Sequence, residues 1–220
     1  MDNFTLLLLR QRMMESVGKV MVTPVKSVDP RVKRTRKLLQ QAFIELFQEQ
    51  GFTSISIQDI TERATVNRAT FYAHFADKYD LLDSIIREQF QQVVGSLLPP
   101  SPRWGVRSLR MLTAAVFDFL GEFHRDCKPS DTQFDPLIER AVQQEIYAIL
   151  TTWLKQERVP GAGRRVPAET MAGVLSWAIF GTAVQWSRGA RTPSAEEMTN
   201  QVLLVLTEGA ARLTPGLLPE

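Results

Sequence analysis

The segment from residue 56 to residue 75 constrains this chain most, because it reads as two short helices joined by a tight turn. Within eight residues, its second helix carries polar, aromatic and basic side chains: Asn67, Arg68, Thr70, Tyr72 and His74. Such a helix is poor core material. It fits a DNA groove, whose base edges exchange hydrogen bonds with side chains and whose phosphates attract donors. We therefore expect a helix-turn-helix over residues 56–75 that binds double-stranded DNA.

The residues before this segment predict a long amphipathic helix. It should begin near Arg31, after Pro30, and end at Gly51, which can cap a helix C-terminus. Its buried stripe should contain Leu38, Leu39, Ala42, Phe43, Leu46 and Phe47. Similar signals place helix starts at Ser56, Asn67 and Asp77, whose side chains can accept hydrogen bonds from the first turn.

The rest of the chain is helical in pattern as well. The clearest linker is residues 98–102, because three prolines in four residues cannot continue a helix. Beyond it, apolar residues recur at helical spacing in four stretches: 106–123, 134–153, 171–186 and 194–210. We see no alternating strand pattern of useful length. The sequence predicts an all-α fold of about nine helices in two regions.

The N-terminal extension, residues 1–31, shows no sustained periodicity and is expected to be flexible. Residues 1–37 contain nine basic residues against three acidic ones (Arg10, Arg12, Lys19, Lys26, Arg31, Lys33, Arg34, Arg36 and Lys37 against Asp2, Glu15 and Asp29). The net charge of +2 is too small to indicate nucleic acid by itself. A basic arm that leads into a helix-turn-helix is nevertheless typical of phosphate neutralisation.

Cysteine usage and hydropathy indicate a cytoplasmic protein without a membrane anchor. The single cysteine, Cys127, excludes an intramolecular disulfide and a Cys-rich metal site. The apolar run at residues 4–9 is too short for a membrane span or a secretory signal. His124, Asp126 and Cys127 lie close in sequence, but they are too few to predict a metal or redox site.

Five motifs occur in a consistent order and spacing: Arg34-Thr-Arg-Lys-Leu-Leu followed by Ala42-Phe43, Gly51-Phe52, Ile57-Gln-Asp-Ile60, Thr70-Phe-Tyr-Ala-His-Phe75 and Lys78-Tyr-Asp-Leu-Leu82. In these motifs the chain resembles the TetR/AcrR family of bacterial transcriptional regulators. The resemblance implies a helix-turn-helix DNA-binding domain over residues 32–92 and a helical effector-binding and dimerisation domain over residues 104–215. Three positions depart from the family pattern. Thr65 stands where glycine is usual, so a positive φ there would cost about 1 kcal/mol. Asn67 stands where serine or threonine is frequent, and Ile55 stands where a hydroxyl residue is common.

Eleven residues are candidates for DNA contact: Lys33, Arg34, Ser56, Gln58, Asn67, Arg68, Ala69, Thr70, Tyr72, His74 and Lys78. Arg68 is favoured for a base contact, because bidentate pairing with guanine discriminates by about 1–3 kcal/mol. Ala69 could touch a thymine methyl group or simply favour the helix. Tyr72 and His74 resemble the family's phosphate contacts, or else pack between the third and fourth helices. Lys78 either touches the DNA backbone or is solvated. Ser56, Gln58 and Thr70 are caps or surface residues first and phosphate or base-edge donors second, and Asn67 caps the third helix. Lys33 and Arg34 either flank the duplex or belong to a solvated run of charges.

The second region offers two further candidate sites. The resemblance implies that some of its aromatic and soft apolar residues line a largely apolar pocket: Met111, Phe117, Tyr147, Trp153 and Trp177. At helical spacing, these residues could equally be ordinary core. Small and apolar residues on the last two helices suggest a second packing surface: Gly173, Gly181, Ala183, Leu203, Leu206 and Ala210. The resemblance implies that these helices pair with their copies in a four-helix bundle.

The best hypothesis is a ligand-released repressor that binds a palindromic operator as a homodimer and responds to a small apolar effector. Two-fold symmetry would place the recognition helices about 34–36 Å apart. The alternative is a constitutive or architectural DNA-binding protein without an effector. We expect no enzyme activity, cofactor or metal, because the sequence contains no Ser/His/Asp set, no Gly-rich phosphate loop and no paired carboxylates in an apolar setting.

Overall fold

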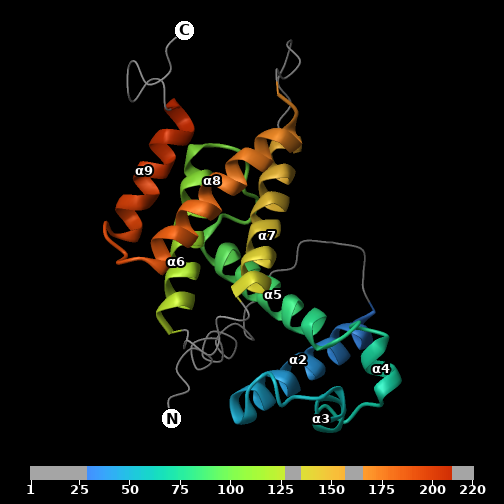
Figure 1. Cartoon of the computed structure of the whole chain (residues 1–220). Coiled ribbons are helices and arrows are strands. Elements are labelled where there is room, and N and C mark those ends of the chain that lie inside the picture. Colours follow the sequence, from blue (N-terminus) through green and yellow to red (C-terminus); the bar gives the residue numbers. More distant parts are fainter. Residues whose placement is uncertain (1–28, 127–134, 157–165, 210–220) are drawn as a thin grey trace. The chain divides into compact units, whose positions relative to one another are not determined.

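The computed structural model describes residues 29–126, 135–156 and 166–209, and all regular structure within them is helical (Figure 1). These residues form eight helices, which confirms the prediction of an all-α fold. The chain divides into two compact units, residues 1–89 and 90–220. The division lies inside α5 (Lys78–Leu97), not at the proline-rich segment 98–102.

The first unit begins with α2 (Pro30–Gln50). Asp29 starts this helix by accepting a hydrogen bond from the backbone of Arg31 at 2.9 Å, and Gly51 ends it with φ +74°. Both ends are as predicted. The predicted apolar stripe needs one correction, because Leu38 is 44% exposed while Ile44 is buried. The core side of α2 is therefore rotated slightly from the expected one.

The helix-turn-helix consists of α3 (Ile57–Arg63) and α4 (Arg68–Tyr72). Ser56 and Asp59 form a reciprocal capping box at the start of α3, and these bonds from Ser56 lower the pKa of the Asp59 carboxyl group. In the turn between the helices, Thr65 has a φ of +56°. The turn therefore has the left-handed geometry that glycine adopts without strain, and a β-branched residue occupies it.

Aromatic side chains form the centre of the first unit. Phe43 and Phe52 meet edge to face with ring centres 6.0 Å apart. Phe71 and Phe75, one turn apart at α4, are both buried, as predicted, with ring centres 5.9 Å apart. The buried rings of Phe71 and Phe75 thus hold the short α4 in place, because its own five residues would be marginal as a helix.

The second unit contains the end of α5 and four long helices: α6 (Val106–Asp126), α7 (Asp135–Gln156), α8 (Ala168–Arg188) and α9 (Ala195–Glu208). α6 packs against both α8 and α9, and α8 also packs against α7 (Figure 1). The α8–α9 contact is smaller than either contact with α6. None of the helices in the described ranges is long and apolar enough to span a membrane.

Candidate nucleic-acid interface and ligand pocket

The exposed side of α4 is the most distinctive surface of the first unit. Arg68, Ala69 and Tyr72 are exposed, whereas Phe71 between them is fully buried. This division follows from helical geometry, since one side of a five-residue helix can face the core while the other faces outward. The three outward side chains combine a guanidinium group, a methyl group and a phenol, which can contact guanine, thymine and phosphate respectively.

Arg68 and Tyr72 contact each other one turn apart on α4. The Nη2 atom of Arg68 donates to the Tyr72 hydroxyl oxygen at 3.2 Å, and the guanidinium carbon lies 5.7 Å from the ring centre. The structure thus brings together the residue predicted to read a base and one predicted to touch a phosphate. The tyrosine limits the directions in which the arginine can point.

Other predicted contact residues are engaged in local hydrogen bonds. The Oδ1 atom of Asn67 accepts from the Thr70 backbone at 2.7 Å and from the Thr70 hydroxyl at 2.9 Å. Gln58 donates to Glu62 at 2.8 Å. Ser56 is part of the capping box at α3. All four predicted residues therefore have a structural role that does not depend on DNA.

His74 is half-buried at the C-terminal end of α4, and its carbonyl oxygen accepts a hydrogen bond from Nη1 of Arg36 at 3.3 Å. The same guanidinium group lies 4.4 Å from the ring centre of Phe75. Arg36 therefore anchors the first turns of α2 to the C-terminal end of α4. It was not among the eleven candidates, because sequence spacing does not reveal a contact across 38 residues.

Lys78 lies at the start of α5 and its ammonium group is directed into the protein. The Nζ atom donates to the carbonyl oxygens of Ile55 at 2.8 Å and Phe52 at 3.0 Å, with Thr53 at 3.5 Å. It also lies 4.5 Å from the ring centre of Phe52. This geometry ties the loop before α3 to α5 and leaves little of the ammonium group for a phosphate.

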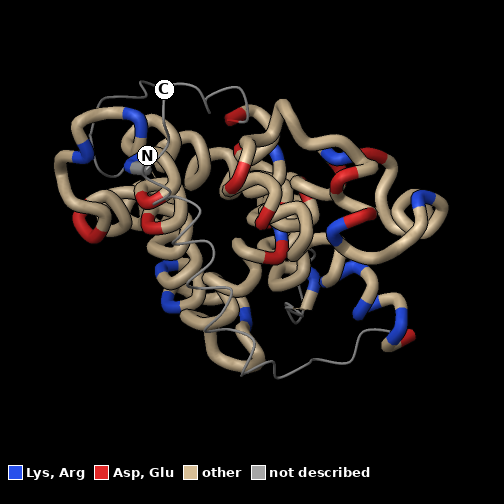
Figure 2. The backbone as a smooth tube through the Cα atoms, turned by 90° about the horizontal axis from the view of Figure 1, so that it is seen from below, with Lys and Arg blue, Asp and Glu red and all other residues tan. Residues whose placement is uncertain are grey.

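The beginning of α2 is strongly basic. Lys33 and Arg34, both predicted contacts, are exposed there. Figure 2 shows Lys and Arg following one another closely along these first turns. An exposed run of cations at the start of a helix can neutralise DNA phosphates. Exposed Lys and Arg side chains that are simply solvated by water would look the same.

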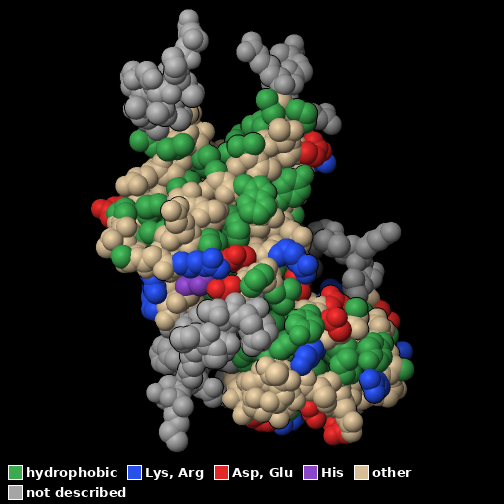
Figure 3. Space-filling view, in the orientation of Figure 1, with side chains coloured by type: hydrophobic (Ala, Val, Ile, Leu, Met, Phe, Trp, Pro, Cys, Tyr) green, Lys and Arg blue, Asp and Glu red, His purple; other side chains and the backbone are tan. Residues whose placement is uncertain are grey.

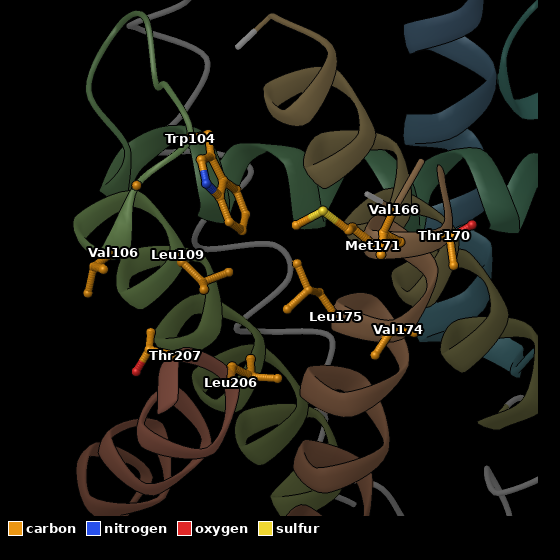
Figure 4. A pocket seen from close by; sticks show the side chains of 11 residues that line it. Trp104, Val106, Leu109, Val166, Thr170, Met171, Val174, Leu175, Leu206 and Thr207 are labelled. Atoms are coloured by element: carbon orange, nitrogen blue, oxygen red, sulfur yellow. The ribbon is translucent and has the colours of Figure 1, made fainter. Parts of the chain in front are cut away.

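A second candidate site is an apolar pocket of about 570 Å³ in the second unit. Figure 4 shows four side chains that point toward one another across it, from the chain before α6, from α6 itself and from α8: Trp104, Leu109, Met171 and Leu175. The remaining wall is formed by Gly105, Val106, Val166, Thr170, Val174, Leu206 and Thr207. No charged side chain belongs to this lining. A pocket of this size and composition suits a small apolar molecule.

None of the five residues predicted for the pocket lines this one. Phe117 and Trp153 are buried core residues, and Trp177 is 61% exposed. Met111 and Tyr147 are half-buried elsewhere on α6 and α7. This pocket is therefore built from other positions, because helical periodicity identifies the inward side of each helix but not where neighbouring helices diverge.

Two residues of the predicted pairing surface are corrected. Ala183 and Leu203 are buried within the second unit, so they are not available to a second copy. Gly181 is exposed and Gly173 and Leu206 are half-buried, whereas Ala210 lies outside the described residues. Large apolar side chains are exposed instead at Val174 and Trp177 on α8, and at Leu204 and Val205 on α9. On the face of the molecule that Figure 3 draws, hydrophobic side chains lie over several parts of the second unit.

A buried polar cluster joins the ends of α6, α7 and α8. Nδ1 of His124 lies 2.9 Å from the Ser187 hydroxyl, and its Nε2 lies 3.9 Å from Asp135. Arg188 pairs with Asp135 at 3.3 Å and with Glu139 at 2.6 Å. Burial lowers the pKa of His124, although the Asp135 carboxylate acts in the opposite direction, and burial raises the pKa of Glu139. Arg188 is shared between the two carboxylates, and the cluster holds three helix ends together.

The sequence profile of the bacterial regulatory proteins, tetR family, matches residues 39–85. Over 73 residues the chain is 41% identical to the HTH-type transcriptional regulator YxbF of Bacillus subtilis, which covers 33% of this chain and 19% of that protein. It is 33% identical over 60 residues to the dhaKLM operon transcriptional activator DhaS of Lactococcus lactis (27% and 32% covered). It is 28% identical over 123 residues to the transcriptional repressor DhaR of a Mycobacterium species (54% and 62% covered). The alignments span less than two thirds of each relative's length.

Proposed function

We propose that this chain, whose residues 39–85 match the bacterial regulatory proteins, tetR family, is a transcriptional regulator that binds DNA through α4. The observation that carries the proposal is the exposed side of α4. There Arg68, Ala69 and Tyr72 face outward while Phe71 anchors the helix in the core. A short helix held rigidly from one side is suited to enter a major groove.

We propose further that the regulator acts as a homodimer on a palindromic operator. The support is the set of large apolar side chains that are exposed on α8 and α9, because extensive exposed apolar surface on a protein is typical of an interaction site. A two-fold axis would then place two α4 helices about one DNA turn, roughly 34–36 Å, apart.

Repression with release by a small apolar effector is the regulatory mode that we favour. The longest of the three alignments is with a repressor, and the apolar pocket offers a site for the effector. The pocket also favours this mode over a constitutive or architectural DNA-binding protein, which would need no such cavity. An effector can release DNA only if it binds the DNA-free conformation more tightly than the DNA-bound one.

The test is selection of a binding site from random DNA, followed by comparison of the wild type with Arg68→Ala. We expect a palindromic site, and we expect Arg68→Ala to lose about 1–3 kcal/mol on that site with little change on random DNA. The matched control is Arg103→Ala, a substitution in the second unit that should change neither affinity. Equal weakening of Arg68→Ala on both DNAs would assign the arginine to the phosphate backbone. Failure to enrich any sequence would contradict the proposal.

A further inference from the structure

Tyr72 is anchored to the core of the first unit through its ring. The ring meets that of Phe71 edge to face, with ring centres 5.6 Å apart and an angle of 88° between the two planes. Phe71 is fully buried and packs in turn against the buried ring of Phe75. Tyr72 itself remains 48% exposed. The tyrosine ring therefore has a fixed support in the core and is still accessible from solvent.

The guanidinium group of Arg68 rests on this tyrosine, one turn along α4. Its Nη2 atom donates to the Tyr72 hydroxyl oxygen at 3.2 Å, and its carbon lies 5.7 Å from the ring centre, within the range of about 6 Å for a cation–π contact. No carboxylate pairs with Arg68 within the part of the chain that the structure describes. Arg63 on α3 differs, because it donates to both carboxylate oxygens of Glu49 at 2.8 and 2.7 Å. Arg68 is thus held by an uncharged neighbour, and its charge stays available to DNA.

The contact leaves both groups able to meet DNA. A guanidinium group has five N–H donors, and one of them is used on Tyr72. Two of the others suffice for O6 and N7 of a guanine. The Tyr72 hydroxyl accepts the arginine N–H with an oxygen lone pair, so its own proton can still be donated to a phosphate. Holding the arginine is therefore compatible with a base contact by Arg68 and a backbone contact by Tyr72.

Holding Arg68 favours binding only where there is a base for it to read. A free arginine side chain samples many rotamers and loses that freedom when it binds. Support from Tyr72 restricts those rotamers before DNA arrives, which lowers the cost of ordering the side chain. A phosphate contact, in contrast, contributes on every sequence. The two roles of Tyr72 can therefore be distinguished by comparing DNA sequences.

We propose that Tyr72 is a positioning residue for sequence recognition, which holds the Arg68 guanidinium group in the direction that reads a base. Preference at that base pair then depends on a side chain that does not touch it. This inference rests on the proposed function, which assigns Arg68 to a base. If Tyr72 served only as a phosphate contact, as the family resemblance implies, its effect would add to that of Arg68. A positioning role makes the two effects depend on each other.

The experiment is a double-mutant cycle with the full chain. Affinity is measured for the wild type, Arg68→Ala, Tyr72→Phe and the double variant on two DNAs: the selected site, and the same site changed at the base pair where Arg68→Ala loses its preference. We expect Tyr72→Phe to weaken binding to the selected site by about threefold to tenfold and to change little on the altered one. In the Arg68→Ala background, Tyr72→Phe should have almost no further effect. Tyr72→Leu, which also removes the ring, should show a larger loss with the same dependence on Arg68.

A change in the DNA provides a second readout. 7-Deazaguanine lacks the N7 acceptor but keeps its base pairing. Placed at the guanine that Arg68 reads, it should weaken wild-type binding most, Tyr72→Phe binding less, and Arg68→Ala binding hardly at all. A merely structural role of Tyr72 would leave this penalty unchanged. The matched control is Tyr79→Phe, which removes the hydroxyl group of another exposed tyrosine, on α5, and should bind both DNAs as the wild type does. Circular dichroism and thermal melting check that each variant folds.

The possible failures are separable. Absence of any selected site, or an unchanged sequence preference in Arg68→Ala, overturns the base-reading part of the proposed function and this inference with it. A Tyr72→Phe variant that weakens both DNAs alike, with or without Arg68, overturns this inference alone and leaves Tyr72 as a phosphate contact. A Tyr72→Phe variant that binds as the wild type does on both DNAs also overturns this inference alone.

Discussion

In the first unit, the observed geometry of two residues bears on what was expected from the sequence: the turn at Thr65 and the DNA contact at Lys78. Thr65 occupies a left-handed turn that suits glycine, and Lys78 donates to backbone carbonyl oxygens although its position suggested a DNA contact. The sequence shows which side chain stands at each position. It does not show the backbone angle of Thr65 or the hydrogen-bond partners of Lys78.

Replacing Thr65 by glycine should stabilise the protein. The left-handed conformation costs a non-glycine residue about 1–2 kcal/mol, and the added chain entropy of glycine offsets about 0.5–1 kcal/mol of the gain. We expect urea unfolding to show a net increase of about 0.5–1 kcal/mol. Thr53→Gly, in a loop outside the positive-φ residues, is the control and should be destabilising. Equal losses in both variants would show that Thr65 is unstrained.

Lys78→Met should lower stability and spare the salt dependence of DNA binding. The substitution leaves the carbonyl oxygens of Phe52 and Ile55 without their charged donor, which we expect to cost about 1–2 kcal/mol in unfolding experiments. Lys33→Met, at an exposed position on α2, should behave oppositely, with unchanged stability and a salt slope shallower by about one unit. A shallower slope for Lys78→Met would mean that this lysine touches phosphate after all.

At the scale of elements, contacts with neighbouring helices fix the positions of the short α4 and of several helix ends. α4 is short and depends on Phe71, Phe75 and the Arg36 contact to His74 for its position. The ends of α6, α7 and α8 depend on the polar cluster around His124 and Asp135. Packing between apolar side chains does not change with pH, whereas the stability contributed by a buried imidazole changes when the ring binds a proton.

The His124 cluster predicts a pH dependence of stability. Burial holds the pKa of His124 below its usual value, so the unfolded chain binds a proton more readily than the folded one. Its contribution is present above the ordinary pKa of about 6.5 and is lost as the pH falls through that value toward the folded pKa. When the pH is lowered from 7.5 to 5.5, the melting temperature should therefore fall less for His124→Asn than for the wild type. Parallel pH profiles for the two proteins would contradict this.

For the whole molecule, the pairing prediction separates exposed from buried positions. Trp177→Glu should give a folded monomer, because aromatic residues at the centre of an interface contribute about 2 kcal/mol or more to pairing. Ala183→Glu should instead reduce helix content, since that position is fully buried in one copy. Sedimentation and circular dichroism on both variants make the comparison. An intact dimer in Trp177→Glu would move the interface away from this side of α8.

The sequence by itself determined the helical class, both ends of α2, the starts of α3 and α4, and the helix-turn-helix with its outward polar residues. These features are local: a capping side chain, a closing glycine and a period of 3.6 act within a few residues of the chain. The motif order in residues 32–92 added the resemblance to the family whose profile matches residues 39–85, because its five pieces are themselves local.

Only the tertiary structure decided which apolar residues line the pocket and which remain exposed. The helical period placed Phe117, Trp153 and Ala183 on apolar sides, and they are indeed buried, but in the core of the second unit. Whether an apolar side chain meets another helix, a cavity or the surface depends on where helices far apart in sequence converge. α8 and α9 both pack on α6 and diverge from each other, and no periodicity along one helix encodes that divergence. Packing between helices is a relation among distant residues, so it is settled only when the chain is folded.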